Sequence, residues 1–324
     1  MKIDERIQDI GIVPVVKIHA IEDTLPLANA LLEGGIDVAE ITYRSEFASD
    51  AIALIHKELP NMLVGAGTVL SVEQASDAVN AGARFIITPG LNIDVITWCL
   101  QHDVPIFPGV SSASELEIAL SYGITTVKFF PAESSGGAKK LKDLLAPYPH
   151  VKFIPTGGIN EKNIHEYLSL PNVLAIGGSF MLPNDALQEK DWDKIQQLSK
   201  HAIKHMLGFE LIHLGINSSD SEESQRTAKL LCELFDFTYY KKPKSNFAGK
   251  GFEVLHGKGK GEHGHIAIFT PYPNKALYQL SKKGIQAIQE SITRNKQTQL
   301  INFAYLDLEI AGFGIHLINP DVKM

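Results

Sequence analysis

Eight short runs of apolar and β-branched residues recur between residues 12 and 179, and their spacing decides the fold. They are IVPVVKI (12–18), IDVAEITY (36–43), MLVGAGTV (62–69), RFIITPG (84–90), VPIFPGV (104–110), ITTVKFF (124–130), VKFIPTGG (151–158) and VLAIGGS (173–179). Consecutive runs start 20 to 27 residues apart. The stretches between them have helical periodicity, and several end in the glycine that is common just after a helix. This alternation indicates parallel β-strands connected by helices.

The number of these units separates two α/β folds. Eight strand–helix units within about 200 residues favour a compact (β/α)8 barrel. A doubly wound sheet is the competing fold, and six or fewer units would have favoured it. We therefore expect an α/β protein that begins with a (β/α)8 TIM barrel. Its active site is expected at the C-terminal ends of the strands.

Composition narrows the class of protein. Of the 324 residues, 44% are apolar and 21% are charged, as in an ordinary globular protein. No apolar run approaches the roughly 18 residues of a membrane-spanning helix, and the start, MKIDERIQDI, is too charged for a signal peptide. Only two cysteines are present, Cys99 and Cys232, which favours a cytoplasmic location. The net charge of −7 argues against binding to nucleic acid.

The charge balance changes along the chain and indicates two domains. Residues 1–208 carry 16 Lys and Arg against 25 Asp and Glu, whereas residues 209–324 carry 14 against 12. A polar, helix-prone stretch at 184–205 precedes this change, and a fresh apolar run, FELIHLGI, begins at residue 209. We predict a barrel domain at residues 1–206 and a smaller α+β domain at residues 207–324.

Two charged residues stand inside apolar strands of the predicted barrel. Lys128 lies in TTVKFFP (125–131), where burial penalises the ammonium and favours the neutral amine that forms a Schiff base. Glu40 lies in VAEITYR (38–44) and faces the same mouth, where a carboxylate can shuttle protons. The structural alternatives are a lysine that reaches the rim and a glutamate that only pairs with a nearby base. The interpretations are compatible, because an ion pair in the resting enzyme can also be the catalytic pair.

Further polar and glycine-rich motifs follow the ends of the other strands. An arginine can bind a substrate carboxylate through two hydrogen bonds, and a nearby threonine hydroxyl can add a third. Paired glycines after the seventh and eighth strands expose backbone N–H groups and indicate an anion site of the kind that barrels use for phosphate. The residues concerned are Arg44, Thr68, Gly157, Gly158, Gly178 and Ser179.

The motifs EITYR, GAGTVL, TPG, PGV, VKFFPAE, PTGGI and AIGGS, in this order, closely resemble a known family. It is the family of 2-keto-3-deoxy-6-phosphogluconate and 2-keto-4-hydroxyglutarate aldolases, and the resemblance covers about residues 5–205. It implies a class I aldolase, a carbon–carbon lyase of the Entner–Doudoroff pathway. Such an enzyme yields pyruvate with glyceraldehyde 3-phosphate, or pyruvate with glyoxylate. The resemblance also implies a homotrimer and no metal or other cofactor for this reaction.

The resemblance assigns roles to individual residues. It implies that Lys128 forms the Schiff base with the 2-oxo acid substrate and that Glu40 is the general acid/base, acting through a bound water. The residues implied to bind substrate are Arg44, Thr68 and Pro89 around the pyruvate portion, Phe130 nearby, and Gly157, Gly158, Gly178 and Ser179 at the phosphate or distal carboxylate. Two positions depart from the family, because Tyr43 replaces an aliphatic residue and Phe180 replaces a common tryptophan.

The second segment contains an internal duplication. LIHLGIN (211–217) and HGHIAIF (263–269) each place a histidine in an apolar strand, and a helical stretch and further strands follow both. We therefore expect two βαβββ modules. This layout resembles the glyoxalase-like, or vicinal-oxygen-chelate, superfamily, whose two modules close around one divalent metal. The ligands that the resemblance implies are His213, Glu253, His265 and His316, although a carboxylate is usual at the last position.

These donors suit Zn, Ni, Mn or Fe, and the alternative is a scaffold that keeps the fold without a metal. Six lysines between residues 241 and 260 are typical of a solvated loop, with an anionic ligand as the other interpretation. For the whole chain, the alternative to an aldolase is a phosphate-sugar isomerase or binding barrel with a ligand-sensing tail. A pyruvate imine on Lys128 distinguishes the two.

Overall fold

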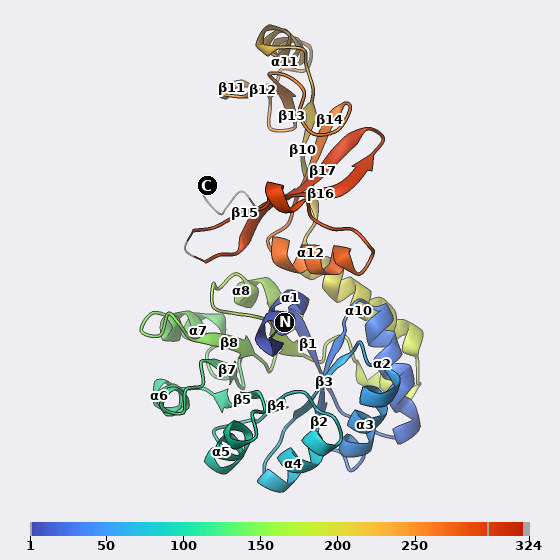
Figure 1. Ribbon diagram of the computed structural model, residues 1–324, viewed down its shortest axis with the longest axis vertical. Helices are drawn as coiled ribbons and strands as arrows, with labels where there is room; N and C mark the ends of the chain where they lie inside the picture. The colour runs from blue at the N-terminus through green and yellow to red at the C-terminus, as the bar shows by residue number, and fades with distance from the viewer. Residues whose placement is uncertain (1, 297, 320–324) are drawn as a thin grey trace. The chain divides into compact units, whose positions relative to one another are not determined.

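The computed structural model describes residues 2–296 and 298–319, and the chain divides into two compact units, Met1–Met206 and Leu207–Met324. In the first unit, parallel strands alternate with helices, and the helices lie outside the strands (Figure 1). The strands are β1 (Ile12–Val16), β2 (Val38–Thr42), β3 (Leu63–Gly67), β4 (Ile86–Ile87), β5 (Ile106–Phe107), β6 (Gly109–Val110), β7 (Thr126–Phe129), β8 (Lys152–Pro155) and β9 (Ile176–Gly178).

The helices of this unit are amphipathic and turn their apolar sides toward the strands. They are α1 (Ile3–Ile10), η1 (Ile21–Asp23), α2 (Thr24–Glu33), α3 (Ala48–Glu58), α4 (Val72–Asn80), α5 (Ile93–Gln101), α6 (Ala113–Ser121), α7 (Gly137–Leu145), α8 (Ile164–Leu168), α9 (Asn184–Gln188) and α10 (Trp192–Leu207). Local sequence sets several of their starts. Ser112 and Glu115, for example, form a capping box that begins α6.

The strands of the first unit form a ring. Six of them pair in the order β5-β4-β3-β2-β1-β9, and three more in the order β6-β7-β8. Parallel bridges such as Thr156 to Gly177 join β8 to β9. β5 and β6 are two parts of one extended segment that Pro108 interrupts, because proline has no N–H for the ladder. The prediction of a TIM-type α/β fold is confirmed.

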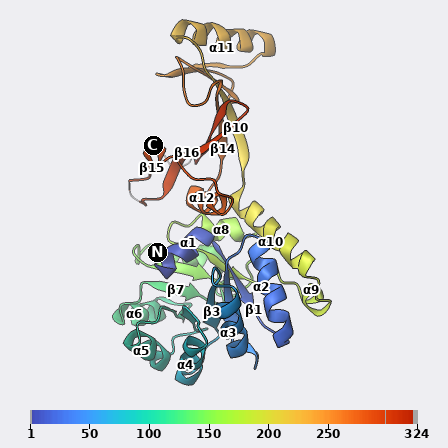
Figure 2. The ribbon, with the colours of Figure 1, turned by 45° about the vertical axis from the view of Figure 1, so that its right-hand side comes forward.

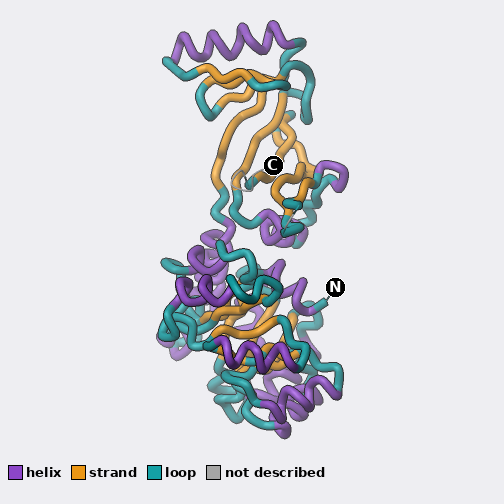
Figure 3. Tube along the Cα trace, turned by 90° about the vertical axis from the view of Figure 1, so that its left-hand side faces the viewer, coloured by secondary structure: helices purple, strands orange, loops and turns teal. Residues whose placement is uncertain are grey.

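The second unit is built on one eight-stranded sheet in the order β11-β12-β13-β10-β14-β17-β16-β15. Its elements are β10 (Glu210–Ile216), α11 (Ser221–Phe235), β11 (Tyr239–Lys241), β12 (Ser245–Ala248), β13 (Phe252–Leu255), β14 (Gly264–Phe269), α12 (Pro273–Ser281), η2 (Gln289–Ser291), β15 (Thr293–Arg294), β16 (Ile301–Ile310) and β17 (Phe313–Ile318). The strands run side by side through this unit in Figure 3.

Two halves of this sheet share one topology. In each half the first strand pairs in parallel with the last, and the two middle strands follow as an antiparallel meander. The first strands of the halves, β10 and β14, pair with each other in antiparallel fashion. α11 packs on β12 and β13 (Figure 2), and α12 packs on β16. The chain thus forms two βαβββ modules. Counted from the centre of the sheet outward, the strands of each module lie in the order first, fourth, third, second.

Two further features are the lengths of the helices and the environments of the two cysteines. Among the residues described, no helix is both long and apolar enough to cross a membrane. Both cysteines are free thiols, and Cys99 is fully buried whereas Cys232 is partly exposed. Burial raises the pKa of the Cys99 thiol to about 12, because the surrounding apolar side chains do not solvate a thiolate.

Candidate active site and metal centre

Lys128 and Glu40 form a buried ion pair inside the barrel. Lys128 lies on β7 and Glu40 on β2, and the lysine Nζ is 3.1 Å from Glu40 Oε1. Their exposed fractions are 4% and 1%. Because β2 and β7 are not neighbours in the sheet, the two side chains meet only by pointing into the interior of the ring. The structure therefore brings together the two charged residues that the sequence singled out.

A glycine on the neighbouring strand leaves room for the Glu40 carboxylate. A Cβ atom on Gly67, the last residue of β3, would lie 2.1 Å from Oε1 and 2.3 Å from Cγ of Glu40. A Cβ on Gly65 would lie 2.3 Å from the ring of Phe85. Such distances are far inside van der Waals contact, so each glycine is required by a side chain from a different strand. The GAG motif thereby shapes the interior around the ion pair.

Phe130 and Thr68 extend the site at the ends of β7 and β3. The Lys128 Nζ atom lies 5.1 Å from the centroid of the Phe130 ring, within the range of a cation–π contact. Thr68 follows β3 with a φ of 54°, a left-handed conformation that is uncommon for a threonine. This backbone turn ends the strand, and the side chain that it carries is only partly buried.

Pro89 and Arg44 stand at the ends of β4 and β2. The Pro89 carbonyl oxygen would lie 2.2 Å from a Cβ on Gly109, so the end of β4 packs directly against β6. Arg44 is exposed, and its Nε donates to Thr42 Oγ1 at 3.3 Å. The structure thus places Phe130 against Lys128, and places Thr68, Pro89 and Arg44 on the same edge of the ring without direct contact to the lysine among the interactions described.

The glycines predicted to bind an anion come from neighbouring strands. The bridge between Thr156 and Gly177 holds the C-terminal ends of β8 and β9 together. Gly157 and Gly158 follow β8 with φ values of 103° and 80°, which side chains rarely allow. A Cβ on Gly158 would also meet the side chain of Glu133 at 2.6 Å. The paired loops also carry Gly178 and Ser179.

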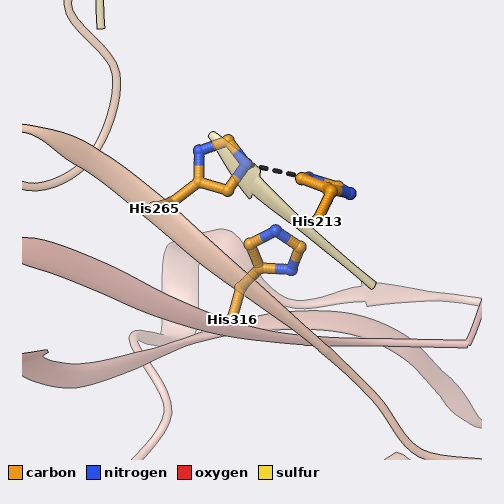
Figure 4. Close-up of side chains that lie close together, drawn as sticks. All are labelled: His213, His265 and His316. Atoms are coloured by element: carbon orange, nitrogen blue, oxygen red, sulfur yellow. Dashed lines mark hydrogen bonds between the residues drawn. The ribbon is translucent and has the colours of Figure 1, made fainter. Parts of the chain in front are cut away.

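In the second unit, three histidines gather on the central strands. His213 lies on β10, His265 on β14 and His316 on β17, and one nitrogen of each ring lies within 4.8 Å of the others. Figure 4 shows the three rings turned toward one another, with 3.0 Å between Nε2 of His213 and Nε2 of His265. Ring nitrogens that converge in this way suit a cation that replaces their protons.

Glu253 on β13 completes the cluster. Its Oε2 atom lies 3.1 Å from Nε2 of His213 and 3.3 Å from Nε2 of His265. The other oxygen, Oε1, accepts a 2.6 Å hydrogen bond from the buried Ser245 hydroxyl. Burial alone would raise the pKa of Glu253, but the hydrogen bonds from His213, His265 and Ser245 outweigh it and hold the pKa well below its usual range.

The surroundings of the histidines fit a divalent metal ion. Burial, and then the neighbouring His265 and His213, lower the pKa of His316 to about 3, so this ring is neutral and free to donate a lone pair. The buried Nδ1 atoms of His265 and His316 have no hydrogen-bond partner among the described residues. A Cβ on Gly215 would lie 2.2 Å from the His265 ring, so this glycine leaves the space that the ring fills.

Sequence reasoning did not identify several residues of these sites. They are Thr42, Asp77, Gly67, Gly215, Ser245 and Tyr305, the last of which has its ring 5.1 Å from that of His316. Apart from Thr42, which accepts from nearby Arg44, each contacts a residue from a different strand or helix, as Asp77 does by accepting from the Tyr43 hydroxyl, and the sequence alone does not give that pairing. The available signal was strand alternation, which puts Thr42 on the same face as Glu40.

The comparisons with known proteins match the first unit of the chain. A family model described as KDPG and KHG aldolase matches residues 3–198. The chain is 46% identical over 200 residues to a 2-dehydro-3-deoxy-phosphogluconate aldolase of Treponema pallidum, a match that covers 62% of this chain and 95% of the relative. It is 44% identical over 193 residues to the KHG/KDPG aldolase of Escherichia coli K12, covering 60% of this chain and 91% of the relative.

Solved structures of aldolases are also similar to the first unit. KDPG aldolase from Legionella pneumophila, solved with pyruvate captured at low pH as a covalent carbinolamine intermediate, is 42% identical, with a TM-score of 0.60. The match covers 62% of this chain and 98% of that one. The aldolase of Zymomonas mobilis ZM4, solved with 3-phosphoglycerate, is 37% identical with a TM-score of 0.59, covering 62% and 95% of the two chains. With the family model matching more than half of its length, this chain belongs to the KDPG and KHG aldolase family.

Proposed function

We propose that the barrel is a class I aldolase that cleaves a 4-hydroxy-2-oxo acid into pyruvate and an aldehyde. The observation that carries this proposal is the buried pair of Lys128 and Glu40, whose atoms lie 3.1 Å apart at the centre of the ring. The substrates are 2-keto-3-deoxy-6-phosphogluconate, which yields glyceraldehyde 3-phosphate, and 2-keto-4-hydroxyglutarate, which yields glyoxylate. Relatives named for both substrates support this assignment.

The ion pair supplies both the nucleophile and the acid of the first steps. Transfer of the shared proton from Lys128 to Glu40 leaves a neutral amine, which bonds to C2 of the substrate while the carbonyl oxygen takes the proton back from Glu40. Glu40 then accepts a proton from the nitrogen and delivers it to the new hydroxyl. That hydroxyl leaves as water and the iminium forms.

The same carboxylate serves the cleavage. Glu40, through a water molecule, takes the proton of the C4 hydroxyl, and the C3–C4 bond breaks. Its electron pair flows into the iminium, so the aldehyde leaves and an enamine remains on Lys128. C3 of the enamine takes a proton from Glu40, and water then adds at C2 to release pyruvate and restore the amine. One water leaves when the iminium forms, and one adds when pyruvate is released, so the atoms of the whole cycle balance.

The remaining residues bind the two ends of the substrate. Arg44 and Thr68, with Pro89, surround the pyruvate portion, where a guanidinium matches a carboxylate with two hydrogen bonds. Phe130 packs beside Lys128 and keeps water from the imine. The distal phosphate or carboxylate lies against the backbone N–H groups of the loops after β8 and β9, which carry Gly157, Gly158, Gly178 and Ser179.

Borohydride trapping tests this function directly. The protein is reduced in the presence of pyruvate, digested and analysed by mass spectrometry. A pyruvate adduct is expected on the peptide that contains Lys128, and it should vanish in Lys128→Ala. Lys152→Ala, which removes an exposed lysine from the next strand, is the matched control and should keep the adduct. A folded protein without an adduct on Lys128 would support the alternative, an isomerase or binder of phosphate sugars.

We also propose that the chain assembles as a homotrimer in the cytoplasm. The family resemblance motivates the trimer, and the two free cysteines are consistent with a reducing compartment. Size-exclusion chromatography with light scattering should give the mass of three chains. A monomer or dimer mass at micromolar concentration would refute the assembly.

A second proposal concerns residues 207–324, which we infer to be a glyoxalase-like domain with a divalent metal. Two observations support it: the duplicated first–fourth–third–second strand order, and the convergence of His213, Glu253, His265 and His316 from four central strands. These residues would hold the ion, which supplies a Lewis acid at this centre. Ser245 would fix the orientation of the Glu253 carboxylate, because it occupies the oxygen that faces away from the histidines.

The metal content of the purified protein tests this second proposal without any assay of activity. Elemental analysis after purification without chelator should give about one equivalent of a transition metal per chain, and Co²⁺ titration should give absorption bands of a nitrogen-ligated site. His265→Ala should lower both. His263→Ala removes an exposed histidine two residues away and should change neither. Equal metal content in the two variants would show that His265 does not hold the ion, and wild-type protein without bound metal would indicate a scaffold that keeps the fold alone.

A further inference from the structure

The strand that carries Glu40 ends with a second polar side chain, Thr42, and Arg44 lies in the turn that follows. Successive residues of a strand point to opposite faces, so Glu40 and Thr42 share the inner face of β2, and Arg44 follows in the turn at the C-terminal end of that strand. Glu40 is fully buried, Thr42 is fully buried, and Arg44 is exposed. The chain therefore passes within four residues from the buried ion pair to an exposed arginine at the end of β2.

The Thr42 hydroxyl has a fixed direction. Its Oγ1 donates a 2.8 Å hydrogen bond to the carbonyl oxygen of Val16 on β1. With its only proton used there, the hydroxyl offers a lone pair to Arg44, whose Nε donates to it at 3.3 Å. The hydroxyl thus holds the guanidinium from the inner side.

Tyr43 holds the same turn from the outer side. Its N–H donates to the Gly67 carbonyl oxygen at 2.8 Å, and its hydroxyl donates to Asp77 Oδ2 on α4 at 2.8 Å. Burial, and then the hydrogen bond to Asp77, raise the pKa of Tyr43, so its hydroxyl keeps the proton that it donates. The backbone that carries Arg44 is therefore tied both to β3 and to α4.

The surroundings of Arg44 show why such a hold matters. Arg44 lines a cavity of about 440 Å³ whose wall also includes Glu46 and Asp77, two carboxylates that compete for a guanidinium. No ion pair of Arg44 occurs among the described residues, and the Tyr43 hydroxyl occupies one oxygen of Asp77. The hydrogen bond from Tyr43 thereby leaves Asp77 one fewer oxygen with which to attract Arg44.

We propose that Thr42 and Tyr43 are positioning residues that hold Arg44 over the barrel mouth, ready for the carboxylate of a 2-oxo acid. This inference rests on the proposed function, because it takes Arg44 as the group that binds that carboxylate. A side chain that is already placed loses less freedom when substrate binds. The family resemblance leads us to expect an aliphatic residue at position 43, and the hydroxyl of the tyrosine supplies the outer hold.

Steady-state kinetics separate positioning from structure. Thr42→Val removes the hydroxyl at nearly constant volume, and Tyr43→Phe removes the bond to Asp77. Each should raise KM for 2-keto-3-deoxy-6-phosphogluconate about 10-fold, the loss of one hydrogen bond, while kcat stays within about 2-fold. The reason is that Lys128 and Glu40 are unchanged. Thr42→Ser should restore KM.

Tyr148→Phe is the matched control. The Tyr148 hydroxyl donates to Glu117 at 2.9 Å on the barrel surface, so losing it should leave KM and kcat unchanged. Thermal unfolding shows whether Thr42→Val folds poorly. If it does, the KM and kcat of Tyr43→Phe still test the proposal. A fall in kcat with unchanged KM, or no change in either, overturns the proposal.

The experiments distinguish a barrel that is no aldolase from an aldolase in which Thr42 and Tyr43 do not position Arg44. If wild-type protein forms no borohydride adduct with pyruvate, the proposed function itself fails. If the adduct forms and Arg44→Ala raises KM, but Thr42→Val and Tyr43→Phe do not, only the positioning roles are wrong.

Discussion

The substitution Gly67→Ala should disable the barrel by moving one carboxylate. The new Cβ atom would lie 2.1 Å from Glu40 Oε1, whereas ordinary van der Waals contact starts at 3.4 Å. The carboxylate must therefore move by about 1.3 Å. Glu40 is 1% exposed and paired with Lys128 at 3.1 Å, so no solvent-filled space accepts it. The substitution changes no charge and removes no catalytic atom.

The expected loss follows from the distance. A shift of that size away from Lys128 lengthens the contact to about 4.4 Å, which at an effective dielectric constant of about 20 weakens the pair by about 1.5 kcal/mol. Misplacement of a reacting group by about 1 Å typically costs about 100-fold in rate. We therefore expect kcat for cleavage to fall about 10-fold to 100-fold.

The assay couples pyruvate release to lactate dehydrogenase and follows NADH absorbance, with circular dichroism to verify folding. Gly90→Ala is the control, because a Cβ at Gly90, on the neighbouring strand end, would meet nothing within 4 Å. Wild-type kcat in a folded Gly67→Ala protein would show that the position of Glu40 does not set the rate, and the reasoning would be wrong.

Three further predictions concern Glu40, Gly215 and the two cysteines, and each has its own assay. Glu40→Gln should lower kcat by about 100-fold or more with the fold intact, because an amide cannot relay protons; near-normal kcat in the coupled assay would remove Glu40 as the shuttle. Gly215→Ala should lower Co²⁺ affinity by at least about 10-fold, because the new Cβ displaces the His265 ring, and unchanged affinity in titration calorimetry would place the metal elsewhere. At pH 8 native protein should be alkylated by iodoacetamide at Cys232 and not at Cys99, whose raised pKa keeps it a buried thiol; rapid labelling of Cys99 would contradict this.

The sequence was sufficient for features that depend on short stretches of chain. Lys128 and Glu40 stand out because a charge inside an apolar strand is a local anomaly, and the parity of the strand tells which face each occupies. The eight runs predicted the order of strands and helices because their spacing is regular. His213 and His265 were visible for a similar reason, since the duplicated modules repeat the same pattern 52 residues apart.

The features that the sequence did not predict depend on which distant residues lie opposite each other in the fold. Gly67 matters because of Glu40, and Gly215 because of His265, and neither pair shares a segment of chain. Tyr43 was noticed as unusual, but its partner Asp77 lies on a helix 34 residues away. The split between β5 and β6 likewise depends on how Pro108 meets its neighbouring strands. Such register is set by packing of the whole ring, which no local pattern records.

The central pairing of β10 with β14 has a consequence for how the chain is made. β10 pairs with β13 on one side and with β14 on the other, so the second module covers an edge of the first. A chain that stopped near residue 262 would leave that edge of β10 with unpaired N–H and C=O groups, beside the largely exposed Leu211. Open apolar edges template intermolecular sheets. The second module thus covers this edge in the finished chain, and premature termination in this region should yield insoluble protein.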